Sequence, residues 1–239
     1  MNLPAELKML NGKNKKLART AIKRMSLSAL FTVSAMTSSS SYAGTAIGVG
    51  GSTLGYQVAL SQSISENVNL KLAHNAASRG FDGETDGVNY DYDFDFESTS
   101  LLIDWHILGG GFRLTTGALI NDNKIFAQSD IDGLTLEVGD TVFTSAEVGR
   151  LEGDISFDSY APYLGFGWGR AIVDGFSFVF DIGVVFQGEP EVSLQSVGGT
   201  FSNNPLLLAE VEREEQELQE DADEFDMYPV LSLGLFYSF

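Results

Sequence analysis

Several residue types that carry chemistry are missing or scarce. Cysteine is absent from the 239 residues, and there are only two histidines and five prolines. The lack of cysteine excludes a disulfide framework, a cysteine-ligated zinc and a thiol nucleophile. Lysine and arginine number 14 against 33 aspartates and glutamates, and no basic stripe follows the N-terminal region. Because the resulting field repels phosphates, nucleic-acid binding is excluded.

Apolar residues are abundant despite the net charge of -19. They make up 44% of the chain, which includes 26 glycines and 17 phenylalanines. A disordered acidic chain is therefore excluded, since this composition supplies a large surface for burial or for contact with lipid.

The N-terminal region has the three parts of a secretory signal peptide. Seven basic residues between Lys8 and Arg24 precede an apolar segment from Met25 to Met36, and small residues follow up to Ala43. The pattern predicts a signal peptide over residues 1–43, cleaved after Ala43. The apolar segment, about a dozen residues long, is too short for a membrane anchor. Removing 1–43 takes away seven basic residues and one acidic residue, so the mature chain carries a formal charge of -25.

The rest of the chain is dominated by alternation. Phe176, Phe178 and Phe180, for example, are separated by Ser177 and Val179. No later segment has the length of a transmembrane helix, and the face opposite the large apolar residues is mostly Gly, Ala and Ser. Small residues suit the interior of a narrow closed barrel whose apolar face is turned to lipid. Eight strands are expected, at 46–50, 54–64, 67–76, 89–107, 112–121, 154–168, 176–187 and 228–239.

The fold class is therefore all-β: an eight-stranded antiparallel transmembrane β-barrel over residues 44–239, in the outer membrane of a two-membrane (Gram-negative) bacterium. The short connections 65–67, 108–111 and 169–175 are expected to be periplasmic turns. The long ones, 77–88, 122–153 and 188–227, are expected to be extracellular loops. The apolar face changes phase near residues 97–100, 121–124 and 160–162, which predicts bulges at the outer rim.

Two of the long connections contain local signals of structure. Leu134–Val138 and Thr141–Thr144 flank Gly139-Asp140, a hairpin turn signal. Asn204 and Pro205 are a suitable N-cap and first residue for a helix. Ten acidic residues lie between Glu210 and Asp226, opposed only by Arg213. Such a helix is either solvated and frayed, or stabilised by bound cations or by contact with the barrel mouth.

Four segments resemble one known family. They are LLIDW (101–105), APYLGFGWG (161–169), GVVFQGEPEVSL (183–194) and YPVLSLGLFYSF (228–239). In this order, with an acidic helix before the last, they are similar to the small outer-membrane barrels of the CarO type, the ornithine-uptake porins linked to carbapenem uptake. The resemblance implies an eight-stranded barrel and passage of small, often cationic, solutes, without fixing the solute. The terminal Phe239 is shared by outer-membrane barrels generally, as a signal to the barrel-assembly machinery.

Five charged or titratable residues are expected in the lumen. By strand phase the inward-facing set is Lys71, Asp104, His106, Arg113 and Asp181. Arg113 falls opposite His106 and diagonal to Asp104, within reach of an ion pair. These groups either line a narrow polar path or pair with one another and plug the barrel. The plug is favoured, because buried charges must be paired and an eight-stranded lumen is typically filled by side chains.

A second candidate site is an acidic ladder, Asp91, Asp93, Asp95 and Glu97, expected to face inward at the mouth. Its summed potential would attract cations. It therefore suits a cation-preferring entrance or a divalent-ion site bridging to lipopolysaccharide, whereas the simpler alternative is a hydrated rim strand. The alternate residues, Tyr90 to Phe96, suit an interfacial aromatic girdle or a platform for lipid sugars.

Enzymatic chemistry has little support in the sequence. His74 is the only candidate histidine on the lipid-facing wall, and Ser78 lies nearby without a recognisable motif. The GVGG string at 48–51 has no strand–loop–helix setting and no lysine, so no cofactor is expected. The leading functional prediction is porin-like passive uptake of small solutes, with cationic amino acids as one class. The alternative is a closed barrel for structure or surface interaction, contacting lipopolysaccharide or partner surfaces.

Overall fold

A computed structural model describes residues 44–85, 88–130 and 135–239. The predicted signal peptide, Leu134 and the side chain of Tyr90 lie outside the described part. The strands are β1 (Thr45–Ser52), β2 (Gly55–Ser65), β3 (Val68–Thr85), β4 (Val88–Trp105), β5 (Arg113–Asn121), β6 (Lys124–Asp130), β7 (Thr135–Val138), β8 (Thr141–Thr144), β9 (Gly149–Ser156), β10 (Tyr160–Trp168), β11 (Gly175–Phe186), β12 (Glu191–Gly198) and β13 (Met227–Ser238). The helices are α2 (Ser145–Val148), α3 (Pro205–Ala222) and the 3₁₀ turn η1 (Asp223–Phe225). No described helix is long and apolar enough to cross a membrane.

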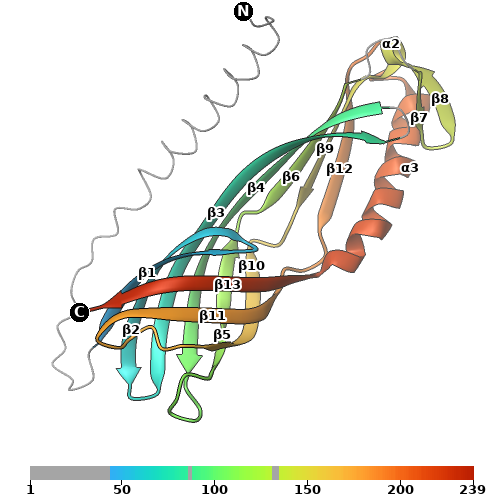
Figure 1. Cartoon of the computed structure of the whole chain (residues 1–239). Coiled ribbons are helices and arrows are strands. Elements are labelled where there is room, and N and C mark those ends of the chain that lie inside the picture. Colours follow the sequence, from blue (N-terminus) through green and yellow to red (C-terminus); the bar gives the residue numbers. More distant parts are fainter. Residues whose placement is uncertain (1–43, 86–87, 131–134) are drawn as a thin grey trace, which may run out of the picture. The chain divides into compact units, whose positions relative to one another are not determined.

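Eight of the described strands close into a hydrogen-bonded ring. Their order is β1, β2, β3, β4, β5, β10, β11 and β13, and β13 returns to pair antiparallel with β1 (Figure 1). The predicted pairing of Trp105 with Leu114 is present. The predicted eight-stranded antiparallel barrel is thus confirmed.

Alternation along each strand separates the wall from the interior. In β10 Leu164, Phe166 and Trp168 are exposed, whereas Tyr163 and Gly165 are buried. Next to the short turns the aromatic rings form a contiguous band: the ring centroid of Trp168 lies 5.6 Å from that of Phe166 and 6.4 Å from that of Phe180. An exposed apolar wall with aromatic rings at its end is the surface that a bilayer solvates.

The segments expected as long connections contain further strands. β3 and β4 continue past the barrel, and β6, β9 and β12 pair with them in the order β3, β4, β6, β9, β12 (Figure 1). We call these parts the sheet extension. The predicted hairpin around Gly139-Asp140 is present as β7 and β8, with Gly139 at a φ of +56°. The expected strand at 89–107 already reached into this part, whereas β3 continues to Thr85, beyond its expected end at residue 76, and β6 and β12 were not expected as strands.

The predicted bulges are absent from the strands that enter the extension. β3 and β4 keep one register from Val68 opposite Trp105 to Thr85 opposite Val88. The pairs Ser98 with Asn121 and Asp95 with Lys124 are likewise in step, although β5 gives way to β6 between them. Strand parity is therefore unchanged, and only the residue type changes: the exposed outward residues of β4 are apolar along the barrel and acidic along the extension.

The inward face of the extension packs on a small apolar core. Seven buried residues form it: Leu136, Val138, Phe143, Val148, Leu151, Leu207 and Val211. The helix α3 begins as predicted, because the Asn204 side chain accepts a hydrogen bond from the Leu206 amide and Pro205 is the first helical residue. Near this core the backbone and side chain of Thr144 donate hydrogen bonds to Glu147, which lower the pKa of that carboxyl.

Candidate functional site

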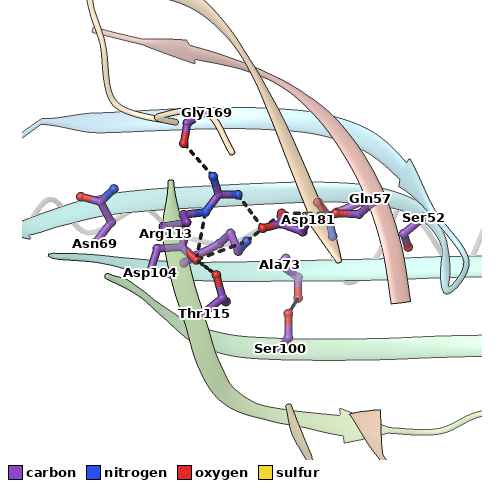
Figure 2. A network of polar contacts seen from close by, with 12 residues as sticks. Ser52, Gln57, Asn69, Ala73, Ser100, Asp104, Arg113, Thr115, Gly169 and Asp181 are labelled. Carbon is purple, nitrogen blue, oxygen red and sulfur yellow. Dashed lines mark hydrogen bonds and ion pairs between the residues drawn. The ribbon is translucent and has the colours of Figure 1, made fainter. Parts of the chain in front are cut away.

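Four charged side chains from four strands meet inside the barrel. Lys71 (β3), Asp104 (β4), Arg113 (β5) and Asp181 (β11) are each at most 5% exposed. We call them the lumen tetrad. Arg113 Nη2 lies 2.5 Å from Asp181 Oδ1, and Arg113 Nε lies 3.5 Å from Asp104 Oδ1 (Figure 2). Lys71 Nζ lies 3.4 Å from Asp181 Oδ2 and 3.6 Å from Asp104 Oδ1. Two cations and two anions make the set formally neutral.

Neutral partners complete the tetrad. Thr115 donates to Asp104 at 2.6 Å, Ser232 donates to Asp181 at 3.3 Å, and Arg113 donates to the Gly169 carbonyl at 2.7 Å. Sequence reasoning missed Thr115 and Ser232, although both lie on the inward phase of their strands. Their hydroxyls hold the carboxylates in position, as buried charges require.

His106 is buried at the short-turn end of the lumen and stands outside the ion pairs. Its Nδ1 lies 3.0 Å from the Gly110 carbonyl oxygen, and its Nε2 lies 3.5 Å from the Asn69 amide nitrogen. Both contacts involve neutral groups, so this side chain orders the turn instead of joining the tetrad.

Glycines inside the barrel make room for large side chains. A Cβ at Gly167 would overlap the tetrad, at 2.5 Å from Asp181 Oδ1 and 3.1 Å from Arg113 Nη2. Gly165 and Gly183 lie against the ring of Tyr163. Gly48 and Gly234 lie against the ring of Phe236, which is 2% exposed. The small inward residues therefore accommodate these side chains, and do not by themselves indicate an open pore.

An apolar layer fills the lumen next to the tetrad, on the side of the extension. Its buried members come from around the ring: Leu54, Leu102, Leu119, Ala161, Tyr163, Val185 and Val230. The tetrad and this layer both place buried side chains inside the barrel, as is typical of eight-stranded barrels.

The acidic ladder does not face the lumen. Asp91, Asp93, Asp95 and Glu97 are exposed, and they alternate with the inward positions that continue from Ser98 and Ser100. Because no bulge inverts β4, the ladder lies on the outward face of the extension, and Lys124 of β6 is opposite Asp95. The expected inward orientation is corrected accordingly.

The aromatic residues between these acids lie on the inward face. Phe94 packs edge to face against Phe81 of β3 at 5.6 Å between ring centroids, and Phe96 lies 6.1 Å from Phe94. They therefore do not form a lipid-facing girdle. They line the concave side of the extension, above the barrel.

Glu and Gln side chains of α3 accept hydrogen bonds from backbone amides of the neighbouring strands and turn. Glu215 accepts from the Leu194 amide at 2.8 Å, while Gln219 accepts from the Val192 amide at 2.9 Å. Glu214 and Glu210 accept from the amides of Gly139 and Asp140, both at 3.1 Å. The helix thus covers the outer edge of β12 and holds the β7–β8 turn. Contact with the fold, and not solvation alone, stabilises it.

Comparison with known proteins comes from structure alone. No protein-family model and no curated protein sequence matches the chain. The crystal structures of CarO2 and CarO from Acinetobacter baumannii do match, with TM-scores of 0.55 and 0.53 at 22% and 23% identity. Each match covers 83% of this chain and 98% of the other. The chain has the fold of the CarO barrel. The resemblance seen in the sequence is thereby confirmed at the level of the fold.

The CarO fold is that of a small outer-membrane β-barrel, and the histidine weighed for catalysis has a neutral partner. His74 Nδ1 lies 3.0 Å from the Thr99 hydroxyl, which is on the neighbouring strand. Among the described residues no group of three or more His, Asp or Glu side chains is placed to hold a metal ion. The two features that remain as candidate functional sites are the lumen tetrad and the sheet extension.

Proposed function

We propose that this outer-membrane barrel is closed to solutes and acts through its sheet extension at the cell surface. The observation that carries the proposal is the lumen tetrad, whose ion pairs join β3, β4, β5 and β11 across the interior. Opening a path would separate buried ion pairs, and leaving one buried charge without its partner costs about 3–5 kcal/mol.

The extension supplies the interacting surface. Its outward face carries exposed Asp93, Asp95 and Glu97, and α3 exposes further acids such as Glu212 and Glu217. On this proposal the extension is extracellular, as the long connections of outer-membrane barrels generally are. Its negative potential attracts cationic partners and cation-bridged lipopolysaccharide.

Conductance in planar lipid bilayers tests this function. The purified barrel is expected to give no conductance above the lipid baseline, while a large open porin in the same lipid gives clear steps. A steady, cation-selective conductance of the wild-type barrel would overturn the closed-lumen proposal in favour of a porin.

Passage of small solutes is the second candidate, and one observation favours it. Gln57 donates to Asn75 at 3.0 Å and Asn75 to Ser98 at 3.3 Å, so polar groups run along one side of the interior. Ser61 Oγ and Asn121 Nδ2 have no hydrogen-bond partner among the described residues, as expected of atoms that water serves. Swelling of liposomes in ornithine, lysine or glycine would support this candidate, and its absence for all three would exclude it.

A further inference from the structure

The sheet extension has two edges, and they differ. The β12 edge is covered by Glu215 and Gln219 of α3, which accept hydrogen bonds from its amides. On the other side β2 pairs with β3 only as far as Tyr56 opposite Ala76. From Ala77 to Thr85 the described residues place no strand on the side of β3 away from β4 (Figure 1). An uncovered edge of this kind is a template for another strand.

The inward face beside the free edge is apolar and hollowed. A cavity of about 340 Å³ lies there, above the β1–β2 turn, and its lining includes Tyr56, Ala77, Arg79, Phe81, Phe94 and Phe96. Phe81 is 55% exposed although it stands in the extension, beyond the lipid-facing wall. An added strand would bring apolar side chains over Ala77, where the cavity is, and against Phe81.

The outward face beside the same edge is acidic. Gly80 has no side chain, so the carboxylate of Asp93 on β4 lies over it, with Oδ1 3.1 Å from where a Cβ would be. Asp82, also exposed, is two residues along β3 on the same face. A lysine or arginine opposite Gly80 would therefore meet two carboxylates from the adjoining strands.

We propose that the free edge of β3 binds an extended segment of a partner protein as an additional strand, with apolar residues on the inward face and basic residues on the outward face. The proposal rests on the surface-interaction function above. Main-chain hydrogen bonds to Ala77–Gly83 give affinity, and the alternating side chains give selectivity. A second copy of this chain is disfavoured as the occupant, since it would place acid beside acid on a chain that is already strongly negative.

Binding of a synthetic nine-residue peptide of alternating Leu and Lys to the purified barrel in detergent tests the proposal, by fluorescence anisotropy. Two N-methylated forms separate strand addition from adhesion by charge. One form carries methyl groups on the Leu amides and the other on the Lys amides, so each blocks one edge of the peptide strand. Only one form is expected to lose affinity, by about tenfold or more, because an added strand bonds through one edge. Equal affinity of both forms would overturn the proposal.

Charge reversal on the barrel is the second arm. Asp82→Lys with Asp93→Lys is expected to weaken the Leu/Lys peptide about tenfold and to strengthen a Leu/Glu peptide. Asp154→Lys with Glu191→Lys changes the net charge equally on the far strands of the extension and is expected to have little effect. Equal losses in both pairs would show unspecific attraction and overturn the site.

Size and conductance of the same preparation separate the remaining outcomes. A dimer that light scattering detects and that the peptide does not disrupt would indicate that a second copy occupies the free edge of β3. That result would overturn the partner-strand proposal. Absence of both peptide binding and conductance would overturn the docking site and leave the closed-lumen function standing. Conductance together with edge-specific peptide binding would overturn the function and keep the site.

Discussion

At the scale of single residues, the interior of the barrel depends on the balance of charge within the buried lumen tetrad. Arg113 is 1% exposed and reaches both carboxylates of the tetrad. Each member has at least one partner of opposite charge, so the loss of one changes the environment of the other three.

Asp181→Asn is expected to destabilise the barrel by about 3–5 kcal/mol, because Lys71 and Arg113 are left with a single buried anion. Unfolding in urea, followed by the fluorescence of the two tryptophans, both of which lie in the barrel wall, measures the change. Asp122→Asn is the control: its pair with Lys124 is exposed and should contribute about 0–1 kcal/mol. A loss at Asp181 no larger than at Asp122 would contradict the stabilising role of the tetrad.

Gly183→Ala is expected to cost about 1–3 kcal/mol, since the new methyl group overlaps the Tyr163 ring. Adding Tyr163→Leu to this variant should recover part of the loss. Gly51→Ala, where no atom lies within 4 Å of the new Cβ, should be nearly neutral in the same urea titration. If Gly183 and Gly51 behaved alike, the ring would not occupy the space that Gly183 leaves.

Alternation was enough to place the charged residues of the lumen, because the inward phase follows from parity within one strand. It could not show that the small inward residues are covered by rings. That depends on register between strands: Gly165 of β10 lies opposite Gly183 of β11, and Tyr163 covers both. Small inward-facing residues are compatible both with an open barrel and with a barrel filled by side chains, so the sequence pattern does not distinguish the two.

At the scale of elements, α3 and β12 form one unit. The helix is acidic not only for solubility, because Glu215 and Gln219, one turn apart, reach the amides of Leu194 and Val192. A hydrogen bond to a charged group typically contributes about 1.5–3 kcal/mol. The covering of this edge is thus built from side chains that composition alone would assign to a solvated face.

Glu215→Ala with Gln219→Ala is expected to speed hydrogen exchange at the Val192 and Leu194 amides by about tenfold or more, because the amides lose their acceptors. Glu212→Ala with Gln216→Ala removes the same two residue types at the same spacing from the exposed face of α3 and should leave those amides protected. Equal exchange in the two variants would show that α3 does not cover the edge.

The change of apolar face along the sequence also explains why bulges were expected at the base of the extension. Apolar residues in β4 shift from even to odd positions near Glu97, and this shift, taken from the sequence alone, predicts a bulge that turns the strand over. The backbone keeps its register, and the solvent outside it changes instead. A bulge and a change of surroundings can be distinguished only when the strands that pair with β4 are known. The additional strands of the extension, β6, β9 and β12, are separated from β4 by many residues.

At the scale of the whole molecule, the sidedness of the two ends decides where the acidic surface lies. The chain has no cysteine, so single cysteine variants report position without interference. Glu217→Cys on α3 should react with a membrane-impermeant maleimide in intact cells. Glu66→Cys, in the β2–β3 turn at the other end, should react only after the outer membrane is permeabilised. The reverse pattern would invert the topology and remove the basis of the surface proposal.

The single register of β3 and β4 also bears on the order of folding. Their pairing runs without a shift from Val68 opposite Trp105 to Thr85 opposite Val88. The pairs near Thr85 and Val88 are the most local in sequence, and local contacts form fastest because they close the shortest loops. We therefore expect the pairing of β3 with β4 to begin near Thr85 and Val88 and to proceed towards the barrel. The register of β3 and β4 would then be set first in the extension, outside the bilayer. The same register would continue into the parts of the two strands that lie in the barrel wall.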